Sequence, residues 1–346
     1  RGAYATRVTT IFSKLCDWIA IPSVTGAERD YAEALTRELT SLGFAVERQE
    51  LGPGRFNVLA RGARPEVVFC THLDTVPPFF GPSEEREVVR GRGSCDAKGP
   101  ALAMVEAAKL LLAEKRDAIG FLFTCGEETD SAGAQLANER LAEPWHPRFT
   151  IVGEPTDNRF VSAHKGVYKA DLVAHGVAGH SSQDIGPSAI HELVTALQRL
   201  LAQDWGRHAL LGPGTLNVGL LQGGVAANVV ADKAVASLLL RAVEEPDVTE
   251  RKVRACLSQH VELAKPYKSY GPTEFHVPHG HAAITAAFGT DAPHLKRWGK
   301  PLLYGPGRIL DAHTDHECLD KRSFERAVHD YAATARELLE RAEAAR

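Results

Sequence analysis

Helical patterns and buried-strand patterns alternate along the first half of the chain. Residues 11–20 and 27–42 have the amphipathic spacing of helices, and the second pattern ends at Gly43. An Ala- and Leu-rich helix is predicted over residues 100–114, with Pro100 in its first turn. Continuous apolar runs, which indicate buried strands, occupy residues 67–71, 120–124, 149–152 and 302–304. This alternation predicts an α/β fold with a mostly parallel sheet flanked by helices.

A different order of elements begins near residue 165. The patterns predict a strand, a helix, two strands, a helix and a last strand, which is the ferredoxin-like order β-α-β-β-α-β. The first five elements are expected at residues 167–174, 188–203, 215–221, 233–240 and 248–264, with the last strand before Val277. We therefore expect an α+β insert at residues 165–274. It would interrupt a domain formed by residues 1–164 and 275–346.

Composition and charge exclude several classes of protein. The 346 residues include 40 Lys and Arg against 44 Asp and Glu, for a net charge of -4, whereas proteins held to nucleic acid by phosphate contacts are usually basic. The chain has no apolar run of the length that a membrane span needs and no signal-peptide pattern in the residues shown. Six widely spaced cysteines without a C-x-x-C pair predict reduced thiols and a cytoplasmic location.

Side chains that can bind metal follow each of the predicted buried strands. Because the carboxyl ends of parallel strands lie at one edge of a sheet, we expect these side chains to meet there. They are His72 and Asp74 after the first strand, Glu127 and Glu128 after the second, Glu154 after the third and His313 after the fourth. Asp96 lies between strands, in a Gly-rich loop just before the predicted helix at Pro100.

This combination of residue types favours a metal centre. Carboxylates brought together without a cation would repel and raise each other's pKa. Imidazole and carboxylate ligands together favour zinc, with cobalt or manganese as alternatives, over magnesium or calcium. Each motif alone also fits an ordinary role, such as a surface Glu-Glu pair or an aspartate in a turn. Their joint placement after buried strands is what favours the metal site.

Short motifs occur in a fixed order along nearly the whole chain. They are Thr-His-Leu-Asp-Thr-Val-Pro-Pro (71–78), Gly-Arg-Gly-Ser-Cys-Asp-Ala-Lys-Gly (91–99), Gly-Glu-Glu (126–128), Val-Gly-Glu-Pro-Thr (152–156), Ala-His-Lys-Gly (163–166), Gly-Val-Ala-Gly-His-Ser-Ser (176–182), Gly-Gly-Val-Ala-Ala-Asn-Val-Val (223–230), Gly-Thr-Asp-Ala (289–292) and Tyr-Gly-Pro-Gly…Ala-His-Thr-Asp-His-Glu (304–317). With these motifs the sequence resembles the family of acetylornithine deacetylase, succinyl-diaminopimelate desuccinylase, aminoacylase and glutamate carboxypeptidase. It most resembles acetylornithine deacetylase.

The resemblance implies a role for each residue at the predicted site. Two zinc ions would be bound, one by His72, Asp96 and Glu154 and the other by Asp96, Glu128 and His313, with Asp96 bridging them. Glu127 would be the general base for the attacking water, and Asp74 would orient His72. The family also implies a cis peptide bond between Asp96 and Ala97.

The resemblance also assigns a role to the insert, as a lid and dimerisation domain. It implies a homodimer in which His180 stabilises the oxyanion. Asn228, Arg241 and Thr290 would bind the substrate, with the Arg241 guanidinium suited to a carboxylate. From the sequence alone His180 could cap a turn, Asn228 could be a loop residue and Arg241 a surface charge at a strand end.

Several other residues could in principle bind metal or take part in chemistry, but the sequence favours ordinary structural roles for them. His276, His279 and His281 are interpreted as a solvated hinge rather than a third metal site. His316 could compete with His313, but the Ala-His-x-x-x-Glu frame favours His313. Cys95 and Cys125 flank predicted ligands, and strand alternation would point both into the packing.

Two features depart from the family pattern. Residues 277–288 leave little room for the helix that relatives have there, and His316 replaces an acidic residue.

The leading functional hypothesis is a zinc-dependent hydrolase of a linear amide. It would remove an acyl group, first of all acetyl, from a small-molecule N-acyl amino acid such as N-acetylornithine, in arginine biosynthesis. The alternatives within the family are a dipeptidase or carboxypeptidase and a desuccinylase. A non-catalytic binding protein is disfavoured because Glu127 and all predicted ligands are present. A serine hydrolase is disfavoured because the chain lacks a strand–G-x-S-x-G–helix elbow. No nucleic-acid or membrane partner is expected.

Overall fold

The chain forms two compact units. The computed structural model describes residues 2–264, 266 and 268–344. Unit 1 consists of Arg1–Ser162, Phe275–Ile284 and Thr290–Arg346, and unit 2 consists of Ala163–Glu274 and Thr285–Gly289. Unit 2 is thus formed mainly by one internal stretch of chain. The sequence-based boundaries for the insert were residues 165–274.

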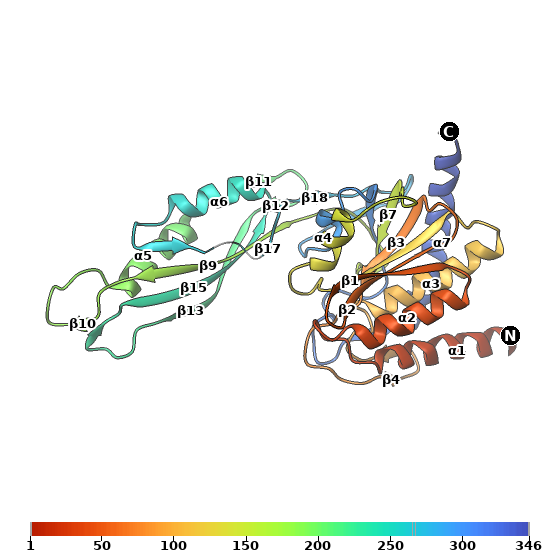
Figure 1. The fold of residues 1–346 in the computed structure, drawn as a ribbon, viewed down its shortest axis with the longest axis horizontal. Coiled ribbons are helices and arrows are strands. Elements are labelled where there is room, and N and C mark those ends of the chain that lie inside the picture. The colour runs from red at the N-terminus through yellow and green to blue at the C-terminus, as the bar shows by residue number, and fades with distance from the viewer. Residues whose placement is uncertain (1, 265, 267, 345–346) are drawn as a thin grey trace. The chain divides into compact units, whose positions relative to one another are not determined.

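Unit 1 is built on a sheet of the order β1-β2-β6-β3-β7-β20 (Figure 1). Its strands are β1 (Ala45–Gly52), β2 (Arg55–Arg61), β3 (Val67–His72), β6 (Ile119–Thr124), β7 (Phe149–Val152) and β20 (Lys300–Leu303). The last four in spatial order pair in parallel, while β1 and β2 form an antiparallel hairpin along β6. The sheet is therefore mixed, with a parallel part that agrees with the predicted apolar runs.

The hairpin of β1 and β2 is absent from the sequence-based prediction. Strand β1 lies at the sheet edge and most of its residues are exposed or half-buried. An edge strand that buries so little carries no apolar run, which is why its pattern gives no strand signal.

Helices flank this sheet. They are α1 (Gly2–Ile19), α2 (Arg29–Ser41), α3 (Lys98–Ala113), α4 (Ala132–Glu139) and α7 (Lys321–Ala344). Helix α3 contacts both α7 and β3, whereas α4 packs on β1, β2 and β6. Nearly every residue of α3 up to Ala108 is buried, because the helix lies between the sheet and other helices. Helix α3 begins at Lys98, two residues after Asp96. The packing of α3 therefore also anchors this predicted metal ligand.

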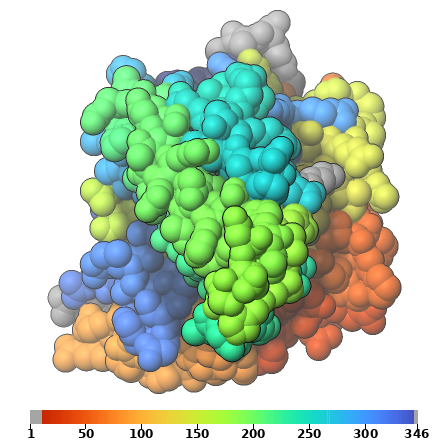
Figure 2. Space-filling model, turned by 90° about the vertical axis from the view of Figure 1, so that its left-hand side faces the viewer, coloured from red at the N-terminus to blue at the C-terminus, as the bar shows by residue number. Residues whose placement is uncertain are grey.

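Unit 2 contains an antiparallel sheet of the order β13-β15-β9-β16, with β17 also paired to β9. Its main elements are β9 (Gly166–His175), α5 (Ala189–Ala202), β13 (Thr215–Gly223), β15 (Lys233–Ala242), α6 (Pro246–Ala255), β16 (Val261–Leu263) and β17 (Lys268–Tyr270). Their order is the predicted β-α-β-β-α-β order. In Figure 2 the surface of these residues, coloured green to cyan, faces the viewer.

The second helix of unit 2 is shorter than predicted. The sequence pattern predicted a helix over residues 248–264, but α6 ends at Ala255 and β16 begins at Val261. Val261 and Leu263 are buried while Glu262 between them is exposed. This alternation is the period of a strand, and a reading at helical period missed it because the strand is so short.

Short strands complete the fold. They are β4 (Ser83–Glu84), β5 (Val88–Arg90) and β21 (Cys318–Asp320) in one sheet, β8 (Phe160–His164), β18 (Thr273–Glu274) and β19 (Ala283–Ala286) in another, and the pairs β10 (Gly179–His180) with β14 (Val229–Val230) and β11 (Arg207–His208) with β12 (Gly212–Pro213). A 3-10 helix, η1, spans Ala292–His294. No helix in the described part of the chain has the length and apolarity needed to cross a membrane.

Candidate metal centre

The last residue of β3 places an imidazole at the carboxyl edge of the sheet of unit 1. His72 is buried, and its Nδ1 lies 2.8 Å from the backbone oxygen of Asp74. A neutral ring that donates from Nδ1 to this carbonyl leaves Nε2 free to bind a metal. Nε2 lies 2.9 Å from Asp96 Oδ1 and 3.9 Å from Glu154 Oε2. The ring is therefore oriented for metal binding by main-chain geometry.

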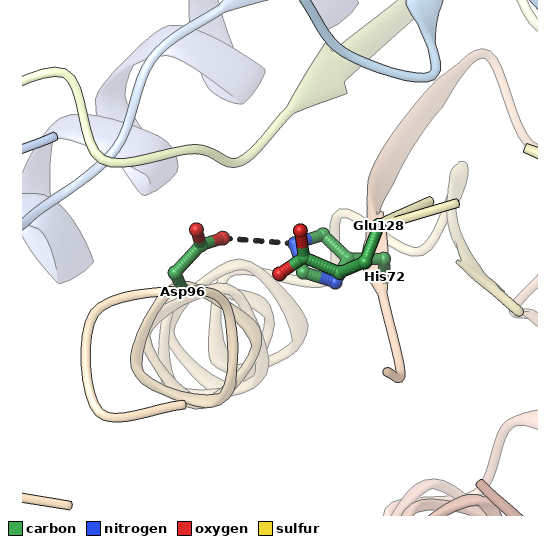
Figure 3. Close-up of side chains that lie close together, drawn as sticks. All are labelled: His72, Asp96 and Glu128. Carbon is green, nitrogen blue, oxygen red and sulfur yellow. Dashed lines mark hydrogen bonds and ion pairs between the residues drawn. The ribbon is translucent and has the colours of Figure 1, made fainter. Parts of the chain in front are cut away.

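The two carboxylate oxygens of Asp96 face two different histidines. Oδ1 lies 2.9 Å from His72 Nε2, and Oδ2 lies 3.1 Å from His313 Nε2. Asp96 comes from the loop before α3, and its peptide bond to Ala97 is cis, as the resemblance implied. Figure 3 shows Asp96 above the start of this helix, with its carboxylate directed at His72. The carboxylate thus lies between two potential metal positions.

Glu128 and His313 complete the cluster from two further segments. Oε2 of Glu128 lies 3.0 Å from His313 Nε2. The ligand atoms of His72, Asp96 and Glu128 all lie within 4.8 Å of one another, and the group could hold a metal ion. His313 has a φ of 63°, a left-handed conformation that is uncommon for residues other than glycine and that clusters at functional sites.

The Asp74 carboxylate contacts the Glu127-Glu128 turn and also faces His72. Its Oδ1 accepts the backbone N–H groups of Gly126 (3.0 Å) and Glu127 (3.1 Å), and its Oδ2 accepts the N–H of Glu128 (3.2 Å). The His72 Nδ1–Asp74 Oδ1 distance is 3.7 Å. Asp74 thus faces His72 with its carboxylate and contacts the ring with its backbone oxygen, and its role in orienting His72 stays a prediction.

Glu127 and Glu154 are buried at the same edge. Glu154 follows β7 by two residues and is 5% exposed, and Glu127 is 8% exposed. Burial raises the pKa of Glu154 well above its usual value, and the charges of Asp96, Glu127 and Glu128 add to this rise. Glu127 therefore lies near enough to Glu154 to repel its charged form.

The pKa shifts in the cluster show that it favours positive charge next to its carboxylates. Hydrogen bonds to Asp96 and Glu128 raise the pKa of His313 to about 10. Burial opposes a charged ring at His72, but neighbouring carboxylates outweigh it and raise that pKa well above the usual value. Burial disfavours the charged form of Asp96 too, yet the two histidines hold its pKa below the usual range. Protons thus supply the positive charge that a divalent cation would supply instead, so the donor set fits metal ions.

The residues predicted in unit 2 form two separate groups. His180 on β10 pairs with Val229 of β14, and the backbone N–H of Ser181 donates to the carbonyl of Asn228. Both His180 and Asn228 are exposed. Arg241 is half-buried near the other end of β15, opposite Thr215 and Val167. His180 and Asn228 are thus neighbours at the small β10-β14 sheet, whereas Arg241 belongs to the larger sheet of unit 2.

Thr290 lies in unit 1 and is completely buried, and its Oγ1 accepts the N–H of Ala292 at the start of η1. In the structure Thr290 thus stabilises the backbone at the start of η1. Its contact with substrate stays a prediction.

Three buried residues at this edge were missed by the sequence analysis. Glu317 accepts a bond from Arg92 (Nη1–Oε2, 2.7 Å), and both side chains are at most 1% exposed. Asp291 accepts the Thr124 hydroxyl (2.7 Å) at the end of β6. All three residues stand inside quoted motifs. Their buried charges would have been the signal, but burial of these loop positions is not visible in the sequence.

The less favoured candidates take ordinary positions. His316 bonds to Asp315 instead of the cluster, and His276 and His281 pack against aromatic rings. Cys95 belongs to the core, and Cys125 donates to the carbonyl of Phe56.

Comparison with known proteins identifies the family. Residues 68–337 match the profile of Peptidase family M20/M25/M40. The chain belongs to this family. This M20 protein is 34% identical over 361 residues to a probable carboxypeptidase of Aspergillus flavus, covering 90% of this chain and 86% of the relative. It is a hydrolase of peptide or amide bonds and a metallopeptidase by family.

Solved structures share the fold. An aminopeptidase of Bacillus cereus has a TM-score of 0.78 at 19% identity, covering 96% of this chain and 99% of that one. A dinuclear metal-binding M20 peptidase of Bacillus subtilis has a TM-score of 0.69 at 17% identity, covering 98% and 99%. The similarity to M20 peptidases supports the family resemblance and the α/β fold, while acetylornithine deacetylase is not among the names of these relatives.

Proposed function

We propose that this M20 protein uses two divalent metal ions to hydrolyse the amide bond of an amino acid that carries a free carboxylate. The observation that carries the proposal is the placement of Asp96, whose two oxygens face His72 and His313 separately. A carboxylate in this position can bridge two ions. The mixed imidazole and carboxylate donors favour zinc, with cobalt or manganese as alternatives.

Each ion would be held by side chains from several segments. His72, Asp96 and Glu154 would bind the first ion, and Asp96, Glu128 and His313 the second. When bound, the ions would supply Lewis-acid chemistry: they would polarise the scissile carbonyl and lower the pKa of a bound water molecule. Burial and, after it, repulsion between the carboxylates raise the pKa values of Glu128 and Glu154, and bound cations would compensate these buried charges.

Glu127 would carry the proton during hydrolysis. Its carboxylate would accept a proton from the attacking water and deliver it to the nitrogen of the leaving amine. Asp74 supports this role because it binds the backbone N–H of Glu127 at 3.1 Å and those of both neighbours. These bonds fix the backbone from which both Glu127 and the predicted ligand Glu128 extend.

Two substrate classes remain candidates for this site. The names of relatives, such as the probable carboxypeptidase of Aspergillus flavus, favour release of a C-terminal amino acid from a peptide. The motifs that resemble acetylornithine deacetylase favour deacetylation of an N-acyl amino acid such as N-acetylornithine. Both substrates present a free carboxylate beyond the scissile amide, and Arg241 would bind it through its guanidinium. Asn228 and Thr290 would make further substrate contacts.

Unit 2 would serve as lid and as dimer interface in a cytoplasmic homodimer. Helix α5 exposes Ile190, Val194 and Leu201, and β13 and the loop after it expose Leu220, Leu221 and Val225. Strand β13 is also an edge strand of its sheet. Exposed apolar residues beside an unpaired strand edge are typical of a surface that another chain covers. In the dimer His180 would donate a hydrogen bond to the oxyanion that forms on a substrate bound in the partner subunit.

Hydrolysis of a small substrate panel tests the proposal. The panel contains N-acetylornithine, N-acetylmethionine, succinyl-diaminopimelate and several dipeptides and longer peptides, each assayed with added zinc, cobalt or manganese. We expect turnover that a chelator removes and that Glu127→Ala abolishes, and the best substrate decides between the two classes. A metal-loaded protein that binds a panel member and leaves it intact would contradict hydrolysis and favour a binding protein.

A further inference from the structure

The loop that carries Asp96 has no regular secondary structure to fix its shape. Residues 91–97 connect β5 to α3 and form turns. Gly91 and Gly93 have φ values of 140° and 87°, conformations that residues with a side chain rarely adopt. Contacts from neighbouring segments therefore add to the loop's own turn hydrogen bonds in fixing the position of Asp96.

A buried ion pair binds this loop. Oε1 of Glu317 accepts the backbone N–H groups of Cys95 (3.1 Å) and Asp96 (3.2 Å). Its Oε2 accepts Nη1 of Arg92 at 2.7 Å. Arg92 also donates from Nε to the carbonyl of Pro78 at 3.2 Å. Burying two charges is unfavourable unless hydrogen bonds satisfy them. Here the Glu317 charge is satisfied by Arg92 and by the backbone N–H groups of Cys95 and Asp96.

The same pair joins the Asp96 loop to the segment of His313. Glu317 follows His313 by four residues, and its carbonyl accepts the N–H of Gly91 at 3.2 Å. Directly beyond, Cys318 pairs with Arg90 between β21 and β5. Glu317 thus fixes the backbone of Asp96 and belongs to the same short segment as His313, the partner of Asp96 Oδ2.

We propose that Arg92 and Glu317 are positioning residues that hold the Asp96 carboxylate between its two histidines and thereby set the affinity for metal. This inference rests on the proposed metal-dependent function. Outer residues that orient ligands in this way commonly change metal affinity or activity by about 10- to 100-fold when they are replaced. The alternative is that the pair stabilises the fold alone.

Zinc titration of matched variants separates these roles. Glu317→Ala removes the acceptor for both N–H groups, and Glu317→Gln keeps an oxygen for them while it removes the charge that Arg92 needs. Leu338→Ala is the control, because Leu338 is fully buried in the core on α7 and contributes no polar group to the loop. Zinc affinity is measured by competition with a chromophoric chelator, alongside thermal unfolding, kcat and KM on the best panel substrate.

We expect Glu317→Ala to weaken zinc binding at one or both sites by about 10- to 100-fold, with kcat reduced more than KM is changed. Glu317→Gln and Arg92→Lys should weaken it less, because each keeps part of the network. Leu338→Ala should lower the unfolding temperature without weakening zinc binding.

The inference is wrong if the folded variants Glu317→Gln and Arg92→Lys bind zinc with wild-type affinity. This outcome decides the question even if Glu317→Ala is insoluble. The inference is also wrong if Leu338→Ala weakens zinc binding as much as these variants do. A wild-type chain that takes up no zinc would instead remove the proposed function, on which this inference depends.

Discussion

The two units differ in how they arrange the residues that we predict to function in catalysis or binding. In unit 1 predicted ligands from five segments converge in a largely buried cluster at the carboxyl end of the parallel strands. In unit 2 His180 and Asn228 are exposed on short strands and loops, and Arg241 lies apart from them. The candidate site of the first unit is already assembled, whereas the predicted residues of the second unit are not gathered into one cluster. This contrast predicts different consequences when residues of each unit are replaced.

The largest loss of activity is expected from Glu127→Gln in unit 1. The substitution keeps the size of the side chain but removes its ability to accept a proton, so kcat should fall by about 10²- to 10⁴-fold. Metal content should stay at the wild-type level, because Glu127 is not a ligand in our assignment. Steady-state kinetics with parallel metal analysis checks this, and loss of the metal together with activity would show that Glu127 is a ligand instead.

His180→Ala in unit 2 should lower kcat by a smaller factor. Loss of one donor to an oxyanion costs about 10²- to 10³-fold, and neither metal content nor stability should change because His180 is exposed. His191→Ala, another exposed histidine of unit 2, is the matched control and should have normal activity. Equal kinetics for both variants would remove His180 from the mechanism and weaken the proposal that unit 2 is a lid.

Asp74→Asn should have an intermediate effect within unit 1. The amide group of Asn can accept fewer of the N–H bonds from the Glu127-Glu128 turn, so we expect kcat to fall by about 10- to 100-fold. Thr25→Val is its partner control, since it removes only the hydroxyl that donates to Asp74 Oδ2 at 2.7 Å. A loss in Thr25→Val as large as that in Asp74→Asn would mean that the bond to Thr25 matters more than the turn.

The smallest effect on catalysis, but a clear one on stability, is expected at His164 of unit 2. Burial lowers the pKa of His164 to about 4, the opposite direction to His72 and His313 in unit 1. Since the unfolded chain binds this proton near pH 6.5, stability is lost as pH falls from about 6.5 to about 4, by about 3 kcal/mol in total. Denaturant unfolding across this range should show a weaker pH dependence in His164→Gln, whereas exposed His175→Gln should behave as the wild type.

The sequence predicted those parts of the molecule that follow from burial and from strand order. Strands β3, β6 and β7 are continuous apolar runs, and the rule that sites form at the carboxyl ends of parallel strands led to His72, Glu128 and Glu154. The order of elements in unit 2 was equally readable, because its strands alternate between buried and exposed positions.

Other features could not be predicted for physical reasons. Asp74 binds the backbone N–H groups of Gly126, Glu127 and Glu128, and because every residue except proline has this group, these partners leave no trace in the sequence. Arg92 and Glu317 are 225 residues apart, and only the folded chain brings their charges together. The exposed edge strand β1 and the short β16 carry too few apolar residues to signal a strand.

The metal content per folded chain tests the central claim most directly. Native mass spectrometry of the wild type and of Asp96→Ala, after dialysis against zinc and removal of loose metal, counts the ions bound. Our account predicts two ions per wild-type chain and loss of both, or retention of one weakly bound ion, in Asp96→Ala, because Asp96 faces both histidines. A single ion in the wild type that persists unchanged in Asp96→Ala would contradict the bridging role of Asp96 and the two-metal site.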